Sequence, residues 1–387
     1  MKTKVNVLFI GMVLLIMLGG FLRPLIKPSE IIYDENRVAV LLPKLSIDSF
    51  KEKDFQDDFE RALSDQIPLS SLMKKFLKNA ELSTKTLGYS LFRNNVYYSI
   101  SSSIYLYNDY LVYGSNSLSV LKSSLDLKSQ NINKAVGILP DTKFFFYYIE
   151  KDTDINFLNN DKVGVFERLL DGLDNRVIAN KFEIDSFDEY KNYFYKTDHH
   201  WNYKGSYRAY TDLVKMVSKE EANSYEKEIC LKSIMSGSKA SSAGSTDIFT
   251  ENFCAYQFNL LEHDVFINGT KVDSYGDYKT INKENPDTIS YGKYYGWDVG
   301  LIEFDYHEPK KENLLIIGES YDNAINELLA SHFNKTYNVD LRAYEMDMHE
   351  PFDLLKFVKK NDISKVLLIG NIDFAVSDTF NIIRDGE

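Results

Sequence analysis

Two short polar stretches hold side chains that could together activate a nucleophile. The first runs from Thr197 to Asn202 (TDHHWN) and the second from Gly318 to Tyr321 (GESY). Asp198 and His200 lie two positions apart, so in an extended segment their side chains point to the same side. A serine hydroxyl becomes nucleophilic when a histidine accepts its proton and a carboxylate orients that histidine. The sequence therefore predicts a triad of Ser320, His200 and Asp198.

The predicted nucleophile follows an apolar run, Leu314 to Ile317, that is typical of a buried strand. Helical spacing resumes from Ala324 to Phe333, so Ser320 is expected on a turn between a strand and a helix. In open parallel sheets, sites form at the carboxyl ends of strands, and a helix N-terminus offers N–H groups to a developing oxyanion. We expect the Ser320 N–H to be one oxyanion donor and Gly296 to supply a second.

Four further side chains are candidates for substrate binding, and three of them also have a structural role open to them. These are Trp201, Tyr295, Tyr321 and Arg342. The two rings at 201 and 321 could instead pack beneath the site, and the guanidinium could pair with a carboxylate of the fold. His199 is expected to be structural or to lie at the rim. Adjacent histidines rarely face one ion, and no Cys and His set has zinc spacing, so we expect no metal or other cofactor.

The elements around the serine turn alternate between strand and helix patterns, which is typical of a parallel α/β unit. Strands are predicted at 142–150, 314–317, 339–344 and 366–369, and helices at 117–133, 165–173, 205–219, 324–333 and 351–360. We expect a three-layer α/β domain over residues 126–387, with a β-rich antiparallel insertion at about 222–311 that includes 291–300. Asn268-Gly269 predicts a type I′ hairpin within it.

The N-terminal region has a different pattern. Residues Val5 to Leu22 carry no charge and form a run about long enough to cross a bilayer as a helix. We expect residues 1–27 to be a signal anchor that leaves the rest of the chain outside the cytoplasm, with a cleaved secretory signal as the alternative. Residues 28–125 are expected to form a helical and hairpin region, in which Pro68 must divide the helical pattern from Phe55 to Leu87.

Charge and cysteine usage limit the classes of partner. The formal net charge is −12, and no cluster of Lys and Arg forms a stripe that could neutralise phosphates, which argues against a nucleic-acid partner. Cys230 and Cys254 are the only cysteines. They could pair in an oxidising compartment, but their separation in sequence says nothing about geometry, so their pairing stays open.

The two polar stretches also resemble those of a known family. TDHHWN, followed by Gly205 and Tyr207, resembles the signature of the DHHW family, which is similar to the alginate O-acetyltransferase-like branch of the SGNH hydrolase superfamily. The stretch from Leu315 to Tyr321 is similar to that family's Gly-Asp-Ser-Tyr turn, except that Glu319 stands where the family usually has Asp. The resemblance implies an SGNH-like fold with the motifs in permuted order and the triad roles given above.

The resemblance also implies a function. It implies acetyl transfer or removal on an extracytoplasmic polysaccharide through an acetyl-serine, with a membrane-bound O-acyltransferase as the source of the acetyl group. We therefore expect an O-acetyltransferase acting on a cell-envelope or exported polysaccharide. A carbohydrate acetylesterase with the same triad is the alternative, because only the acceptor differs. A non-catalytic envelope protein that binds glycans or acts as a scaffold is a third hypothesis, and the presence of all three triad residues weighs against it.

Overall fold

The computed structural model describes residues 96–383 except 245, 247 and 285, and before them 54–66, 70–91 and the positions 10–12, 18, 31–32, 37–38, 40–41 and 43. The chain divides into two compact units. One comprises Met1–Phe92 with Ser241–Ile248, and the other comprises Arg93–Ala240 with Phe249–Glu387. The domain boundaries expected near residues 27 and 125 stay predictions.

The described residues of the first unit include two longer helices and a short strand pair. The helices α3 (Asp54–Gln66) and α4 (Ser70–Leu91) lie on either side of Pro68 in the sequence, as predicted. The strands β1 (Ile31–Ile32) and β2 (Arg37–Val38) pair antiparallel. The Val40 N–H donates to Asp65 Oδ2 over 3.0 Å, which fixes the segment after β2 to α3.

The predicted membrane anchor is not supported. The apolar run from Val5 to Leu22 lies mostly outside the described residues. A spanning helix needs roughly 20 consecutive, mainly apolar residues. Among the residues that the structure describes, no helix has both that length and that apolar character. This finding overturns the prediction of a single-pass anchor.

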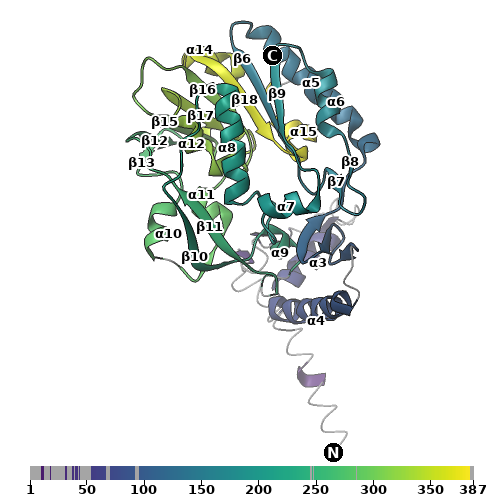
Figure 1. The fold of residues 1–387 in the computed structure, drawn as a ribbon. Helices are drawn as coiled ribbons and strands as arrows, with labels where there is room; N and C mark the ends of the chain where they lie inside the picture. Colours follow the sequence, from purple (N-terminus) through teal and green to yellow (C-terminus); the bar gives the residue numbers. More distant parts are fainter. Residues whose placement is uncertain are drawn as a thin grey trace, which may run out of the picture. The chain divides into compact units, whose positions relative to one another are not determined.

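An eight-stranded sheet organises the second unit, in the order β13-β12-β15-β17-β16-β18-β6-β9 (Figure 1). Five of its strands pair in parallel: β17 (Lys335–Val339), β16 (Asn313–Ile317), β18 (Ile363–Gly370), β6 (Lys143–Ile149) and β9 (Val177–Phe182). The remaining three extend one edge in antiparallel fashion: β15 (Leu301–Asp305), β12 (Asp264–Ile267) and β13 (Thr270–Val272). The predicted α/β class with a mainly parallel sheet is confirmed.

Helices cover both faces of this sheet (Figure 1). Successive residues of a strand point to opposite faces, so they pack in two separate hydrophobic cores. Tyr147 of β6 packs in one core with Tyr210 of α8 (Tyr203–Val217). Phe146 packs in the other core with residues of α5 (Leu118–Ile138), α6 (Val165–Gly172) and α14 (Leu354–Lys360). Each such large apolar side chain contributes about 1.5–3 kcal/mol when fully buried. The apolar strand runs of the sequence therefore form the middle layer of three.

Smaller β elements accompany the sheet. A three-stranded antiparallel sheet of β3 (Tyr98–Ser99), β4 (Ile104–Tyr107) and β5 (Tyr110–Tyr113) forms the predicted hairpin region. Within the expected insertion, β10 (Lys227–Met235) pairs with β11 (Glu251–Gln257) and β14 (Thr288–Ile289). Asn268 and Gly269 join β12 to β13 with φ of 49° and 79°, which a type I′ turn requires. The predicted hairpin is confirmed.

Two segments differ from prediction. The strand expected at 339–344 is instead β17, at Lys335–Val339, because the Asp340 carboxylate accepts the Arg342 N–H and turns the chain there. The first half of the segment 291–300, expected to be β structure, forms the helix α11 (Tyr291–Tyr295). The Ser290 hydroxyl caps that helix by accepting the Lys293 N–H.

Other elements were shortened or missed. The helix expected at 324–333 is a 3₁₀ turn, η2 (Asp322–Ala324), followed by the short α12 (Asn326–Ala330). The parallel strand β9 and the helix α7 (Phe187–Tyr193) were not predicted. In β9 only the two end residues are buried, so the apolar pattern of a buried strand is absent from its sequence.

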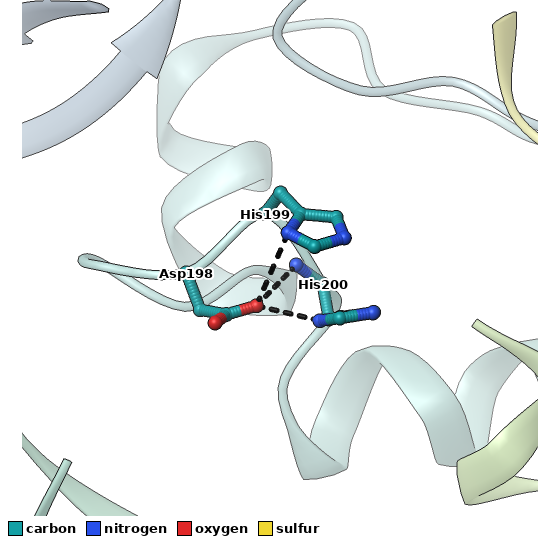
Figure 2. Close-up of side chains that lie close together, drawn as sticks. All are labelled: Asp198, His199 and His200. Atoms are coloured by element: carbon teal, nitrogen blue, oxygen red, sulfur yellow. Dashed lines mark hydrogen bonds and ion pairs between the residues drawn. The ribbon is translucent and has the colours of Figure 1, made fainter. Parts of the chain in front are cut away.

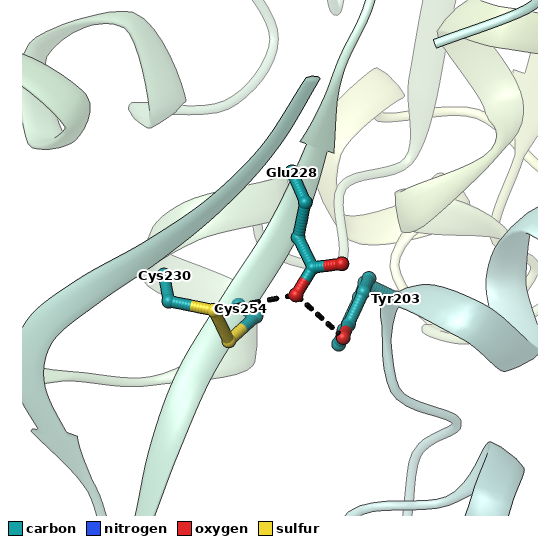
Figure 3. Close-up of a disulfide and its surroundings, with 4 residues drawn as sticks. All are labelled: Tyr203, Glu228, Cys230 and Cys254. Carbon is teal, nitrogen blue, oxygen red and sulfur yellow. Dashed lines mark hydrogen bonds between the residues drawn. A yellow bond between two sulfur atoms is a disulfide. The ribbon is translucent and has the colours of Figure 1, made fainter.

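The two cysteines form a disulfide that joins β10 to β11 (Figure 3). Cys230 and Cys254 are directly opposite each other in the antiparallel register, and their Cα atoms are 4.0 Å apart. Closing a loop of this size stabilises a fold by about 3 kcal/mol in chain-entropy terms. The bond lies at an exposed edge, next to the Glu228 carboxylate, which accepts a hydrogen bond from the Tyr203 hydroxyl.

Candidate active site

The structure brings Ser320, His200 and Asp198 into one chain of hydrogen bonds. Ser320 Oγ lies 2.8 Å from His200 Nε2, and His200 Nδ1 lies 2.6 Å from Asp198 Oδ1. Figure 2 shows the Asp198 carboxylate facing the ring nitrogen Nδ1 of His200. His200 and Asp198 are buried, whereas Ser320 is partly exposed, so a solvent-borne substrate can reach the hydroxyl. The geometry matches that required for proton transfer from serine to histidine.

Ser320 sits three residues beyond the end of β16, on the turn that follows that strand. The Gly318 N–H donates to Val339 O, and the Asp322 N–H donates to Glu319 O, which closes a tight turn around the serine. A Cβ at position 318 would come within 2.0 Å of Asp322 Oδ2, so this turn requires glycine. The Ser320 N–H has no acceptor among the described residues. It is therefore free to donate to a substrate oxygen.

The Asp198 loop is held by residues of the β-rich insertion. The Glu251 carboxylate, at the start of β11, accepts hydrogen bonds from the N–H groups of Lys196 and Thr197 and from the Thr197 hydroxyl. The Gly237 N–H in turn donates to Thr197 Oγ1 over 3.0 Å. The insertion therefore fixes the backbone from which the carboxylate and the imidazole project.

Three donors converge on the Asp198 carboxylate. Oδ1 accepts the backbone N–H of His200 over 3.0 Å and the ring Nδ1–H of His200 over 2.6 Å. Oδ2 accepts the Ser238 N–H over 2.7 Å. Burial alone would raise the pKa of Asp198, but the charge of His200 and its hydrogen bond outweigh burial and hold that pKa well below its usual range. Asp198 is thus an anion suited to orienting an imidazole and to stabilising an imidazolium.

Glu319, directly before the serine, is a second buried carboxyl. Its Oε1 accepts the Asn371 N–H over 2.7 Å, which ties the serine turn to the end of β18. Burial raises the pKa of Glu319 to about 7, against the smaller opposing effect of the Asn371 hydrogen bond. Glu319 therefore braces the serine turn against the end of β18.

Two tyrosines fix the His200 ring. The Tyr291 ring stacks on it with centroids 3.8 Å apart and an interplanar angle of 3°, and the Tyr291 hydroxyl donates to Tyr321 O over 3.2 Å. Tyr321 is fully buried, its ring centroid lies 5.0 Å from that of His200, and its hydroxyl donates to His199 O. Tyr321 thus packs under the site, which is the structural one of the two roles considered for it.

His199 bonds to a different serine, Ser238. Its Nδ1 lies 2.5 Å from Ser238 Oγ, and its ring is tilted against the His200 ring at 3.8 Å between centroids. Burial, followed by the neighbouring His200, lowers the pKa of His199 well below its usual value, so the ring is neutral. Asp198, His199 and His200 lie close enough together to be considered as metal ligands, but both Nδ1 atoms already have partners in Ser238 and Asp198 (Figure 2).

The other predicted site residues have structural partners. Trp201 is fully buried and packs against Phe182 and Tyr321, so its ring offers no platform to a sugar. The Gly296 N–H donates to Gly292 O over 2.9 Å at the end of α11, so it is not available to an oxyanion.

Arg342 and Tyr295 lie behind the site. The Arg342 guanidinium makes a two-point ion pair with Asp340 and bonds Asp298 over 2.7 Å. The Tyr295 ring packs against Tyr291, with centroids 5.0 Å apart. Both residues support the walls of the site, and neither has a hydrogen bond or ring contact with Ser320 or His200.

Several supporting residues were not found from sequence, chiefly Tyr291, Glu251 and Ser238. Each acts through a long-range contact with the stretch 196–200. Their surroundings in the sequence are a tyrosine-rich run and a serine-rich loop, which carry no signal for these contacts. Asn371 is different, because its place directly after the last predicted strand could have marked it as a site residue.

The fold is similar to those of solved bacterial proteins, while no protein-family model and no curated protein matches the sequence. PatB1 of Bacillus cereus, solved with a sulfonyl adduct, is 20% identical, with a TM-score of 0.58 over 73% of this chain and 98% of that one. The O-acetyltransferase domain of Pseudomonas putida AlgJ, at a TM-score of 0.40 and 10% identity over 70% of this chain and 91% of that one, is too distant to bear on the argument. A DHHW family protein from Eubacterium siraeum is 16% identical, with a TM-score of 0.52 over 72% of this chain and 93% of that one. The resemblance seen in the sequence thus extends to the fold.

Proposed function

We propose that this protein is a serine-dependent O-acetyltransferase that acts outside the cytoplasm on a cell-envelope or exported polysaccharide. The observation that carries the proposal is the hydrogen-bonded chain from Ser320 Oγ through His200 to Asp198, with lengths of 2.8 and 2.6 Å. Nucleophile, base and orienting carboxylate are the three groups that acyl transfer through serine requires.

In the first half-reaction, Ser320 Oγ attacks the carbonyl carbon of an acetyl ester while His200 Nε2 takes the hydroxyl proton. Asp198 keeps the other ring nitrogen protonated and balances the imidazolium charge. The oxyanion of the tetrahedral intermediate accepts the Ser320 N–H. When the intermediate collapses, His200 returns the proton to the departing alcohol, and the acetyl group is left on Ser320.

A second oxyanion donor is the side-chain amide of Asn371. In the parallel register, Ile317 of β16 pairs with Leu368 of β18, and the chain continues three residues from each to Ser320 and Asn371. The Asn371 Oδ1 accepts the Asp373 N–H over 2.6 Å, and its Nδ2 has no acceptor among the described residues. A backbone and a side-chain donor would then share the oxyanion.

In the second half-reaction, a sugar hydroxyl gives its proton to His200 and attacks the acetyl-serine carbonyl. Collapse of this intermediate releases the acetylated sugar and restores Ser320. The disulfide between β10 and β11 supports action in an oxidising compartment. The fold likeness to PatB1, which forms a sulfonyl adduct, supports an activated nucleophile in this fold. A membrane-bound O-acyltransferase is the proposed source of the acetyl group.

Labelling and product analysis test this function. An aryl sulfonyl fluoride should add one sulfonyl group at Ser320, detected by peptide mass spectrometry. Ser320→Ala should abolish that label and reduce acetyl transfer from an aryl acetate by at least about 10⁴-fold. Ser364→Ala, at a serine on β18 bonded to Glu312, is the matched control and should retain both. Unchanged turnover in Ser320→Ala would sink the mechanism, and acetate as the sole product in the presence of acceptor glycan would replace transfer by hydrolysis.

A further inference from the structure

A cavity of about 610 Å³ opens beside the candidate active site. This volume is within the range of about 300–1,000 Å³ that small-molecule sites occupy. The cavity lies between the hairpin of β4 and β5, the loop after β6 and the start of α15 (Ile372–Val376). No step of the proposed reaction yet uses it.

The cavity adjoins the serine through two of its walls. His199 forms one wall, and its ring rests on that of His200 at 3.8 Å between centroids. Ile372 and Asp373 form another wall, directly after Asn371, whose N–H donates to Glu319 beside the serine. The cavity is therefore walled by residues that directly contact the His200 ring or directly follow the residue tied to the serine turn.

The lining has the chemistry of a sugar site. Side-chain hydroxyls and an amide face the cavity at Ser103, Ser115 and Asn116, and they can donate and accept hydrogen bonds with sugar hydroxyls. Two half-exposed rings, Tyr105 and Tyr113, supply flat apolar surfaces on which the C–H face of a pyranose can rest.

The charges that line the cavity offset each other. Among the described residues that line it, Lys151 is the only lysine or arginine, and Lys151 Nζ lies 3.4 Å from the Asp373 carboxylate. The Lys151 side chain is only 3% exposed, so the ammonium is enclosed beside its partner and beside the Tyr113 ring, 5.8 Å away. His199, the other ionisable nitrogen at the wall, is neutral. An anionic sugar would find no unpaired cation among the described lining residues, whereas an uncharged sugar needs none.

The cavity is also rigid. The Leu111 N–H of β5 donates to Lys196 O, just before the Asp198 loop, and the Tyr113 N–H donates to Asp152 Oδ2 over 2.9 Å. Asp152 is itself held by the fully buried Lys239. The hairpin is thus locked to the same loop that positions the proposed base, and a preformed site binds without first ordering its own walls.

We propose that this cavity is the acceptor subsite and that it binds uncharged pyranose units of a polysaccharide. The assignment of the bound sugar as acceptor rests on the proposed function, but sugar binding itself does not. The cavity presents hydroxyl-bearing walls, two tyrosine rings and a neutralised ion pair, and one of its walls is His199, whose ring rests on that of His200.

Binding to the full-length Ser320→Ala chain tests the proposal without turnover. Cellotriose and chitotriose are the neutral probes, and trigalacturonate is the anionic one, each titrated by calorimetry. At least one neutral trimer should bind about tenfold or more tightly than trigalacturonate. Adding Ser115→Trp, which places an indole at the exposed rim, should weaken neutral binding by about tenfold or more. Adding Ser119→Trp, at an exposed serine of α5 outside the cavity, should change it less than about twofold.

A charge variant sharpens the test. Asp373 has a 71% exposed side chain, so Asp373→Asn should fold normally while leaving Lys151 without its partner. Trigalacturonate affinity should then rise severalfold. Three results would each overturn the proposal: equal binding by the two tryptophan variants, a preference for trigalacturonate with Asp373 intact, or no binding of either neutral trimer. Failure of sulfonyl labelling at Ser320 would count against the proposed function instead.

Discussion

Two buried carboxyl groups flank the Ser320–His200 pair, and they differ in the number of donors they receive. Asp198, on the loop before α8, accepts two hydrogen bonds from His200 and one from the Ser238 N–H. Glu319, on the turn after β16, accepts one, from the Asn371 N–H. Their exposed fractions, 4% and 6%, are almost the same, so burial does not distinguish them.

The difference in donors sets opposite protonation states. At Asp198 the cost of burial is outweighed by the charge and hydrogen bond of His200, and the pKa falls. At Glu319 burial prevails, and the pKa rises to about 7. One wall of the site thus holds an anion beside the imidazole, and the other holds a carboxyl that is neutral below about pH 7.

The largest expected difference is in activity. Asp198→Asn should lower kcat/KM for acetyl transfer by about 10⁴-fold, because the amide cannot balance the imidazolium. Glu319→Gln keeps an acceptor oxygen for the Asn371 N–H and mimics the neutral acid, so its loss should stay within about tenfold. Steady-state kinetics with an aryl acetate measure both, and melting curves check that both variants fold. Equal losses in the two variants would contradict the assignment of roles.

Glycines on the two walls give the next effect. A Cβ at Gly237 would lie 2.4 Å from Asp198 Cβ and 2.6 Å from its Cα, and one at Gly318 would meet Ile369 at 2.8 Å and Asp322 still closer. Each alanine substitution should lower the free energy of unfolding by about 3 kcal/mol through overpacking. Gly237→Ala should also reduce activity more, because the clash involves the backbone of the orienting carboxylate.

Gly137→Ala is the matched control. This glycine is exposed in α5, and a Cβ there meets nothing within 4 Å. The substitution should stabilise the fold by about 0.5–1 kcal/mol. Urea unfolding of the three variants gives the comparison. If the two buried positions tolerate alanine as well as this one does, the walls are not as closely packed as the structure indicates.

The sequence was most informative where the residues of a short segment determine its structure. Apolar runs of strand length predicted β6, β16 and β18, and the Asn268-Gly269 pair predicted the hairpin, because these features depend on adjacent residues. The pairing of Ser320 with His200 was predicted from two local features, the serine turn after a strand and the Asp-His-His-Trp motif. The chemical roles assigned to them stay predictions.

The sequence was least informative where distant contacts decide. β17 carries Thr336 and Asn338 at buried positions, so its apolar pattern is weak and the strand was placed too late. The Tyr291 stack and the Glu251 clamp join segments that lie far apart in the chain. A second oxyanion donor at Gly296 was wrong for a local reason instead, since the unpredicted short helix α11 uses that N–H.

The pH dependence of stability separates the two carboxyls by a smaller amount. The pKa of Glu319 is raised from 4.5 to about 7. Between those values the folded chain keeps a proton that the unfolded chain has lost, so stability must fall as pH rises. The expected loss is about 2–3 kcal/mol from pH 4.5 to 7, and Glu319→Gln should remove it. Asp198 acts in the opposite sense, because its lowered pKa contributes stability that is lost as pH falls below about 4.

Urea unfolding at pH 5, 6, 7 and 8 measures the slope. Asp154, whose pKa burial also raises to about 7, titrates in both proteins, so only the difference between wild type and variant reports on Glu319. Parallel curves would mean that Glu319 is ionised throughout, and the contrast between the two walls would then be lost.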